Sequence, residues 1–508
     1  MPDTQSSNCK GNESGTDSSI EQQLHEFDDL VEQGVIVIPD SPDNSTKVLD
    51  LIDTEQIEEL PTKPTDGALD IVRETADRRK RKHSCSPEPL EFPNGTIKLT
   101  HILNERRDTT RSFTFSDVVQ KATLRKALLT TFVLDMDWLL PHFGESTKLV
   151  IVKSPNGEQP GVYQSSRVTI VSPIFGTLNY PVMHSKVMLF FHDTYVRLAV
   201  SSANLIPVDW TVLANNLYVH DFPYNPNGKF HEVEFGKMLA QSLCDMDVPK
   251  QVVDELKSVD FSTARVHIVT SVPTPRLKIK RPCAQAYGIE RLAVVMKRLR
   301  ENVAKPDWYN TSLFCYGSSL GALNPQYLYM FYRCALGSTA NGMDNASECL
   351  NMTEAEYKKA VQKRIAVGFH TQEQALSNKF GEIPRASIKF TSDAYCSKTY
   401  PKYALHKIKP KVPDVLIHSK AILARYGKES KGWMYLGSHN FTRGAWGSVR
   451  GDNTVCSYVN NYEFGVVIPN ISYNEPMNTV SWDNGEIPLP FEIPPWVKYE
   501  ESDLPCLN

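Results

Sequence analysis

The chain contains one short pattern twice: a histidine, a lysine two residues later, and an asparagine twenty or twenty-two residues after the histidine. The copies lie 234 residues apart and consist of His184, Lys186 and Asn204, and of His418, Lys420 and Asn440. Their flanks match as well, since HSK is followed by SSANL in the first copy and by GSHNF in the second. A long internal repeat is typical of a duplicated structural unit. The pattern therefore predicts two similar halves, and two unrelated core histidines would explain it poorly.

Each histidine–lysine pair opens a predicted β-hairpin. In the first copy, 187–191 and 195–200 are apolar or β-branched runs, and 192–194 between them suits a turn. Residues two apart on a strand project from the same face. We therefore expect His184 and Lys186 to lie on a strand and to point in the same direction.

Length and pattern together predict an α/β protein. At 508 residues the chain is too long for one compact core, so two domains are expected. Strand patterns at 148–154 and 264–273 and helical patterns at 113–143, 247–262 and 286–302 are mixed along the chain. We place a tail at 1–92, a first domain at 93–273 and a second domain at 274–508, with a basic linker (274–282) at the boundary.

The N-terminal tail differs from the rest of the chain in charge. Residues 1–77 contain 19 acidic and 4 basic residues, a net charge of −15, so the remainder carries +11 of the chain's total of −4. A cationic globular part suits a polyanionic partner, although an ordinary basic surface gives the same bias. The tail itself is polar and poor in aromatic residues, which predicts disorder.

Two motifs in the tail concern location and partners. The basic run 78–82 predicts a nuclear localisation signal, with a solvated basic cluster as the alternative. Four apolar residues beside acidic ones resemble segments that bind a small ubiquitin-like modifier by adding a strand to a sheet edge: Val35, Ile36, Val37 and Ile38. A chance apolar patch is the alternative, and unchanged capture by the modifier after deletion of 35–38 would favour it.

Composition also disfavours several classes of protein. No run of eighteen apolar residues is present, and the N-terminus has no apolar secretory segment. The ten cysteines form no CxxC pair, which fits a reducing compartment and argues against a structural zinc site. We expect a monomer in the nucleus, without membrane attachment, metal or other cofactor.

Two sets of histidine, lysine and asparagine suit phosphoryl chemistry. If the halves pack with pseudo-two-fold symmetry, both sets face one cleft. Lysine and asparagine donate hydrogen bonds to phosphoryl oxygens, and fixed ammonium groups neutralise the charge that would otherwise require a metal. One imidazole can attack phosphorus while the other protonates the leaving oxygen and then activates water.

This arrangement resembles the phospholipase D superfamily, and within it the tyrosyl-DNA phosphodiesterase family. The matching motifs are VMHSKVMLFF, SSANLIPVDW, CYGSSLGALN, GSHNFTRGAWG and YEFGV. Most of the superfamily has an aspartate a few residues after the lysine, whereas Phe191 and Arg425 stand five residues after the lysines here, as in this branch. The resemblance covers about 95–508. It implies two similar domains related by a pseudo-two-fold axis, each a mixed β-sheet flanked by helices.

The resemblance also implies a role for each motif residue. His184 is the expected nucleophile, and His418 the expected general acid and then base. The phosphoryl oxygens are expected to be held by Lys186, Lys420, Asn204 and Asn440. Glu463 matches a carboxylate that supports a catalytic imidazole. A family glutamine that supports the other motif falls near NN here, so that either Asn215 or Asn216 replaces it.

By the same resemblance, Tyr180, Ser318 and Ser319 fall at positions that contact DNA, although turn chemistry alone would also explain the two serines. The implied activity is hydrolysis of the 3′-phosphotyrosyl bond between DNA and a trapped type IB topoisomerase, or of other 3′ adducts. The expected partners are single- or double-stranded DNA and a topoisomerase I peptide. The alternatives are another phospholipase D superfamily lipase or nuclease, and a catalytically silent DNA-binding scaffold, which would bind DNA without turnover.

Overall fold

Most of the predicted globular part is described by the computed structural model. The described residues are 58–59, 90–155, 159–175, 182–225, 233–273, 287–302, 308–338, 352–448, 459–483 and 485–507. The basic run 78–82, the apolar segment 35–38 and the linker 274–282 lie outside them, and the expectations attached to these segments stay predictions.

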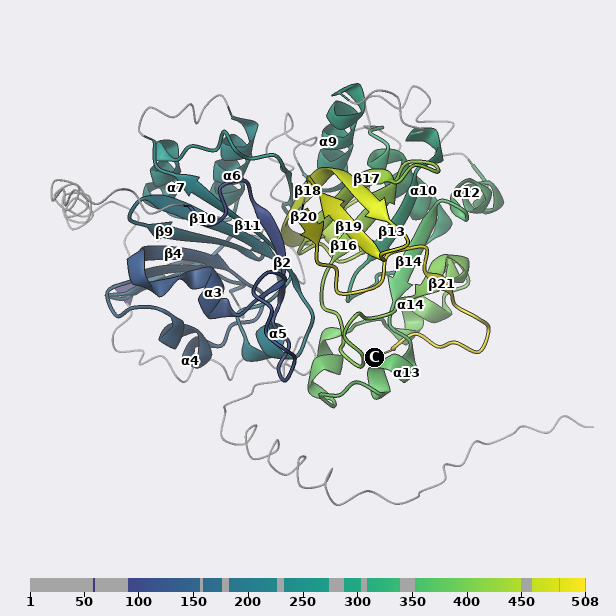
Figure 1. Cartoon of the computed structure of the whole chain (residues 1–508), viewed down its shortest axis with the longest axis horizontal. Helices are drawn as coiled ribbons and strands as arrows, with labels where there is room; N and C mark the ends of the chain where they lie inside the picture. The colour runs from purple at the N-terminus through teal and green to yellow at the C-terminus, as the bar shows by residue number, and fades with distance from the viewer. Residues whose placement is uncertain are drawn as a thin grey trace, which may run out of the picture. The chain divides into compact units, whose positions relative to one another are not determined.

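Two mixed β-sheets form the frame of the protein (Figure 1). Within the described residues the first has ten strands in the order β1-β6-β7-β5-β4-β9-β10-β11-β2-β3. Their bounds are β1 Glu58–Glu59, β2 Thr96–Thr100, β3 Ser112–Phe113, β4 Leu124–Thr130, β5 Lys148–Val152, β6 Gly161–Gln164, β7 Val168–Ser172, β9 Val187–His192, β10 Tyr195–Ser201 and β11 Asn216–Pro223.

The second sheet has eleven strands among the described residues, in the order β20-β19-β18-β17-β16-β13-β14-β15-β21, with β8 and β12 also paired to β18. Their bounds are β8 Val182–Met183, β12 His267–Ser271, β13 Ser312–Tyr316, β14 Ile365–Phe369, β15 Leu405–Lys407, β16 Ala421–Arg425, β17 Lys431–Gly437, β18 Asn461–Asn474, β19 Thr479–Trp482, β20 Gly485–Ile487 and β21 Val497–Lys498.

The internal repeat is visible in the strand order. The run β7-β5-β4-β9-β10-β11 of the first sheet corresponds to β15-β14-β13-β16-β17-β18 of the second. In both runs the first two neighbouring pairs are parallel and the next three are antiparallel. The prediction of two similar α/β halves with mixed sheets is therefore confirmed.

Alternating side chains of the central strands enter different cores. In β9, Val187, Leu189 and Phe191 belong to a core shared with strands of the second sheet, such as β17 and β18. Met188 and Phe190 point the other way, into a core closed by α3 (Phe115–Val119), α4 (Met136–Leu139) and α5 (Pro207–Thr211). Complete burial of a side chain of this size stabilises a fold by about 1.5–3 kcal/mol. Both faces of this sheet are therefore covered.

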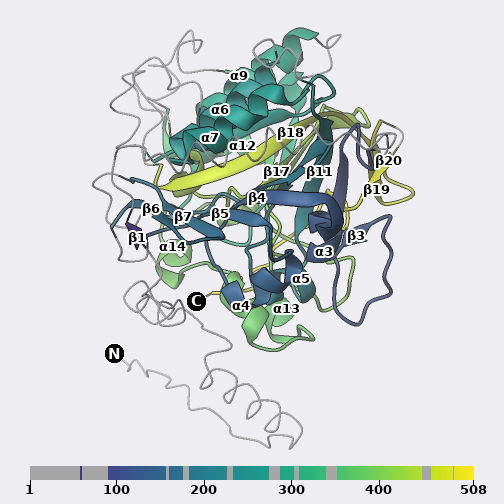
Figure 2. The same cartoon turned by 90° about the vertical axis from the view of Figure 1, so that its left-hand side faces the viewer.

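The remaining helices complete the layers (Figure 2). Residues of α6 (Glu234–Asp245) and α7 (Lys250–Glu255) join the shared core. The outer face of the second sheet is covered mainly by α9 (Gly288–Asn302) and α10 (Pro325–Ala335). Shorter helices follow at α12 (Glu354–Val361), α13 (Gln372–Leu376), α14 (Ser392–Cys396) and α15 (Arg443–Trp446). None of the helices in the described ranges combines the length and apolarity needed to cross a membrane.

Some local predictions were wrong. The helical spacing at 113–143 conceals β4, whose residues Leu128 and Leu129 are buried on opposite faces of the sheet. A strand buried on both faces loses the alternation that distinguishes it from a helix. The helix predicted at 247–262 is shorter, because α7 spans only Lys250–Glu255 before a 3₁₀ turn.

The strands predicted at 264–273 and in the first hairpin are present. The hairpin joins β9 to β10 through Asp193 and Thr194. The strand at 264–273 is β12, and it pairs antiparallel with β18 in the second sheet, with Thr270 opposite Phe464. The chain therefore enters the second sheet before it reaches the predicted linker.

Candidate active site

The two histidine–lysine motifs lie where the chain passes from one sheet to the other. The expectation that they lie on a strand was wrong: residues 184–186 fall between β8 and β9, and 418–420 fall just before β16. The cause is a change of pairing partner. His184 N donates to Tyr462 O of the second sheet at 3.0 Å, whereas β9 pairs within the first sheet. His418 N likewise donates to Ala214 O, at 3.0 Å, before β16 joins the second sheet.

Both lysines are fully buried at this junction. Each ammonium group donates to the carbonyl oxygen of the histidine two residues before it, so Lys186 reaches His184 O and Lys420 reaches His418 O. Burial lowers the pKa of Lys186 to about 8. Burial and repulsion from Lys186 lower the pKa of Lys420 well below its usual value. The effect of Lys186 on Lys420 indicates that the two copies of the motif lie near each other at the junction.

His184 is held by a carboxylate of the opposite half. Its Nδ1 lies 2.9 Å from Glu463 Oε2. Burial disfavours the charged carboxylate, but the contact with His184 and the nearby His439 and Lys186 outweigh it and lower the pKa of Glu463 to about 2. Burial also lowers the pKa of His184, against the opposing effect of Glu463. A neutral imidazole with its Nδ1 proton directed at Glu463 leaves Nε2 with a free electron pair.

His418 is held by two residues of the first half. Its Nδ1 lies 3.1 Å from Asn215 Oδ1 and 3.3 Å from Asp209 Oδ2. Of the two candidate asparagines, Asn215 contacts His418, whereas the side-chain amide of Asn216 is buried and has no hydrogen-bond partner among the described residues. Burial and the nearby Lys420 ammonium lower the pKa of His418 to about 4.

Asp209 is a site residue that the sequence interpretation missed. Its carboxylate is fully buried and also accepts from both the backbone N and the Nδ2 of Asn204. Burial disfavours the charged form of the Asp209 carboxylate, but the contact with His418 outweighs burial, together with other nearby groups, so that the pKa of Asp209 is lowered. A signal was present in the repeat itself, since Asp209-Trp210 in the first copy aligns with Ala445-Trp446 in the second. The two copies share the tryptophan, but only the first has a charged residue before it. Such a difference indicates a position at which the two halves differ in function.

The supports of the two histidines are equivalent in the repeat. Ser202 Oγ donates to Asn215 Oδ1 at 2.8 Å, and Ser438 Oγ donates to Glu463 Oε2 at 2.5 Å. Ser202 and Ser438 each lie two residues before the asparagine of their copy. Asn215 and Glu463 thus occupy matching positions, and each supports the histidine of the opposite half.

The two motif asparagines have their side chains fixed at this junction. Asn204 Oδ1 accepts from Val133 N at 3.3 Å, while its Nδ2 donates to Asp209 Oδ2 at 3.0 Å. Asn440 Oδ1 accepts from Ser319 N at 3.1 Å. With the oxygen of Asn440 occupied, its amide nitrogen is the group oriented for donation.

The residues expected to contact DNA are only partly described. Tyr180 lies outside the described residues. Ser318 is only 1% exposed, and its hydroxyl accepts from Lys420 Nζ at 2.8 Å and lies 3.5 Å from Asn440 Oδ1. Ser319 is partly exposed beside it. The structure therefore places Ser318 behind Lys420 and Asn440, where it orients both.

An exposed aromatic ring not singled out in the sequence lies beside His184. Phe132 is 39% exposed, and its ring centroid is 5.8 Å from that of His184. An exposed aromatic face can stack on a base or on an aromatic leaving group. In the described part of the chain, no three His, Cys, Asp or Glu side chains gather closely enough to hold a metal ion.

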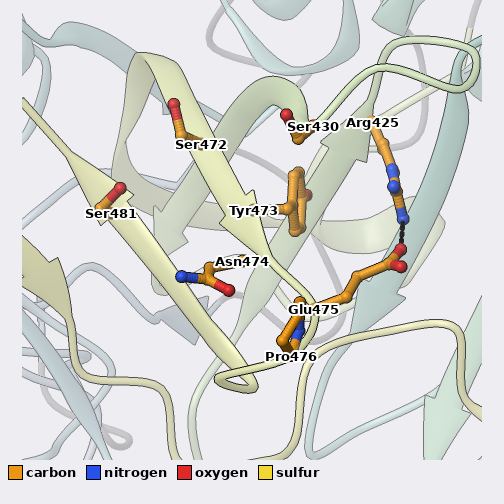
Figure 3. Close-up of a pocket in the computed structure, with 8 residues that line it drawn as sticks. All are labelled: Arg425, Ser430, Ser472, Tyr473, Asn474, Glu475, Pro476 and Ser481. Carbon is orange, nitrogen blue, oxygen red and sulfur yellow. Dashed lines mark hydrogen bonds and ion pairs between the residues drawn. The ribbon is translucent and has the colours of Figure 1, made fainter.

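A separate pocket of about 410 Å³ lies near the opposite end of β18 (Figure 3). Its lining residues are Arg425, Ser430, Ser472, Tyr473, Asn474, Glu475, Pro476 and Ser481. Arg425 and Glu475 form an ion pair, so its charged groups compensate one another. None of the histidines, lysines or asparagines of the two motifs lines it.

Two repeated mixed sheets with a His-Lys-Asn set from each at their junction define a phospholipase D-like protein. A family model described as tyrosyl-DNA phosphodiesterase matches residues 96–500. The chain belongs to the tyrosyl-DNA phosphodiesterase family, as the motifs predicted.

Curated relatives are distant in sequence. "Tyrosyl-DNA phosphodiesterase 1" of Arabidopsis thaliana is 22% identical over 382 residues, which is 70% of this chain and 59% of that protein. The match thus spans less than two thirds of the plant relative. "Probable tyrosyl-DNA phosphodiesterase" of Caenorhabditis elegans is 21% identical over 427 residues, covering 79% of this chain and 86% of that protein.

Solved structures support the fold. The crystal structure of the yeast tyrosyl-DNA phosphodiesterase matches with a TM-score of 0.55 at 16% identity, covering 74% of this chain and 92% of the yeast chain. A mutant of the same yeast protein matches with a TM-score of 0.61 at 16% identity, covering 81% and 98% of the two chains. At this identity the likeness establishes the fold alone.

Proposed function

We propose that this protein is a DNA repair phosphodiesterase that hydrolyses the 3′-phosphotyrosyl bond between DNA and a trapped type IB topoisomerase, and other 3′ adducts. The observation that carries this proposal is that, at the junction, each half supplies the residues that hold the histidine of the other half. The Nδ1 of each imidazole is held by groups of the opposite half, so both Nε2 atoms are left for chemistry beside two buried ammonium groups. Family membership supports the same activity.

In the first proposed step, His184 Nε2 attacks the phosphorus of the adduct. A nitrogen–phosphorus bond forms, the bond from phosphorus to the tyrosine oxygen breaks, and that oxygen takes a proton from His418 Nε2. Glu463 stabilises the positive charge that develops on His184. The DNA remains attached to the protein through its 3′-phosphoryl group.

In the second step, His418 acts as a base. Its Nε2, now without the proton, accepts one from water, and the water oxygen attacks phosphorus. The nitrogen–phosphorus bond breaks, which regenerates His184 and releases DNA ending in a 3′-phosphate.

The charge on the phosphoryl oxygens is proposed to be balanced by the protein itself. Lys186 and Lys420 supply ammonium groups, and Asn204 and Asn440 supply amides whose positions are fixed by hydrogen bonds. Such preorganised donors stabilise the transition state without reorganisation. On this basis the reaction needs no metal.

Binding of a phosphate group is expected to protonate His418. With its pKa lowered to about 4 by burial and Lys420, the imidazole is neutral at pH 7 in the free protein. A phosphate anion adds negative charge beside it, and this raises the pKa. Between the free and bound pKa values the complex holds a proton that the free protein lacks. Affinity for a 3′-phosphate oligonucleotide should therefore fall as pH rises through the bound-state pKa.

Calorimetric titration of that oligonucleotide in buffers of different ionisation enthalpy would measure this proton uptake near pH 7. His418→Asn should remove the part of the uptake that belongs to this imidazole, leaving any contribution of the lysines. Equal uptake by the wild type and His418→Asn would contradict the assignment.

The proposed function is tested by single-turnover cleavage of a 3′-phosphotyrosyl oligonucleotide in EDTA. We expect the wild-type chain to release tyrosine and leave a 3′-phosphate. Abolition of cleavage by EDTA would contradict the metal-free reaction. Turnover of phosphatidylcholine or of unmodified DNA alone would favour another superfamily activity. Binding without turnover would favour the silent scaffold, which the presence of both His-Lys-Asn sets argues against.

A further inference from the structure

The backbone just before each catalytic histidine is held by a buried side chain, and the two halves use different residues for this purpose. Met183 N donates to Ser154 Oγ at 2.8 Å. Ile417 N donates to His370 Nε2 at 3.0 Å. Both acceptors are buried, with Ser154 6% exposed and His370 fully covered. A backbone N–H removed from water needs such a partner.

Ser154 and His370 occupy equivalent places in the repeat. In the first sheet Thr130 pairs with Val152, and Ser154 lies two residues beyond Val152. In the second sheet Tyr316 pairs with Gly368, and His370 lies two residues beyond Gly368. These strand pairs correspond in the two sheets, because β4 and β13 each pair antiparallel with the strand that follows its motif. The fold thus supports the backbone at the same point in both halves.

The peptide groups beside His418 are fixed on several sides. Tyr316 donates its hydroxyl to Ile417 O at 2.6 Å. His418 N donates to Ala214 O at 3.0 Å. Together with the bond from Ile417 N to His370, these contacts satisfy every backbone polar group between Ile417 N and His418 N.

His370 can make its contact only as a neutral imidazole. Because Ile417 N–H is the donor, Nε2 must accept and the ring proton must reside on Nδ1. Burial lowers the pKa of His370 to about 3, so the ring remains neutral at working pH. Its own backbone is secured by Cys506 N, which donates to His370 O at 3.0 Å.

We propose that His370 is a positioning residue for His418. By accepting the Ile417 N–H, it fixes the backbone that carries His418, and so directs the imidazole at the leaving oxygen in the first step and at water in the second. This inference rests on the proposed two-step reaction. Its specific consequence is that damage at His370 should affect the step that depends most on His418, which is hydrolysis of the covalent species.

Two substitutions at His370 separate positioning from a general structural effect. His370→Phe keeps a ring but removes the acceptor, and we expect it to slow hydrolysis of the covalent species by about 10- to 100-fold, so that this species accumulates. His370→Gln places an amide oxygen near the former Nε2 and should restore much of the rate. Ser154→Ala, the matched control, should slow formation of the covalent species on His184 without causing it to accumulate.

The experiment uses the full chain and follows formation and loss of the covalent species in a single turnover, with thermal unfolding recorded for each variant. Tyr316→Phe removes only the hydroxyl on the same peptide group and should also cause accumulation, which keeps the test decisive if His370→Phe does not fold. Equal slowing of both steps, or a Gln variant as impaired as the Phe variant, would overturn the positioning role. If His418→Asn accumulates the covalent species but His370→Phe and Tyr316→Phe do not, only the positioning role of His370 is overturned. If the wild-type chain is inactive, the proposed function is overturned as well.

Discussion

A chain carrying His184→Ala is expected to cleave a 3′-phosphotyrosyl oligonucleotide more slowly than the wild type by on the order of 10⁴-fold or more. Without the imidazole no nitrogen–phosphorus bond forms, and water would have to displace tyrosine directly. The buried lysines and asparagines would still bind the phosphoryl group. The loss should therefore appear in the single-turnover rate rather than in the affinity for DNA, which can be measured separately by fluorescence anisotropy.

The variant His184→Asn controls for the structural effect of removing the His184 side chain. His184→Ala leaves Glu463 as a buried carboxylate without its main partner, and an unpaired buried charge destabilises a fold. His184→Asn retains an amide donor near Nδ1 but has no nucleophilic nitrogen. Both variants should be inactive, and the asparagine variant should unfold closer to the wild-type temperature. Substantial cleavage by His184→Asn would rule out His184 as the nucleophile.

The second large effect is expected from His418→Asn, which should convert the protein into a trap for its own intermediate. Tyrosine, with a pKa of about 10, is a leaving group that can depart slowly without a positioned acid. Water, by contrast, needs a base to attack phosphorus, and a positioned base contributes about 10²- to 10⁴-fold. Hydrolysis of the covalent species should therefore slow more than its formation.

Denaturing electrophoresis of a labelled oligonucleotide during a single turnover measures this effect as a protein–DNA band. The double variant His184→Ala/His418→Asn should give no such band, because it lacks the nucleophile. Slow formation of a 3′-phosphate by His418→Asn without any covalent band would contradict the two-step reaction and favour direct attack by water.

The two similar halves and the candidate site residues could be predicted because both follow from a short pattern that is repeated in the sequence. The spacing of His184 and Lys186, repeated at His418 and Lys420, is visible without any structure. The run β4 was not predicted, because burial of Leu128 and Leu129 on opposite faces removes the alternation typical of a strand. When the residues on both faces of a strand are buried, the spacing of apolar residues cannot distinguish the strand from a helix.

Long-range partners were harder to predict. Glu463 was found through its motif, but its contact with His184 across 279 positions follows from the parallel pairing of β8 with β18. Asp209 was overlooked because its contact with His418 depends on the junction of the sheets. The choice of Asn215 over Asn216 depends on which of two neighbouring side chains faces that junction. These contacts depend on the pairing of strands that are distant in the chain, which local sequence patterns do not specify.

Under the proposed reaction, the support of each catalytic histidine by the opposite half makes activity an all-or-none property of the intact chain. His184 depends on Glu463, and His418 depends on Asn215 and Asp209, so neither half contains even one fully supported imidazole. A fragment produced by cleavage near the middle of the chain would therefore retain no fraction of the reaction. Under the proposed reaction, degradation of such a protein leaves no half-active phosphodiesterase behind.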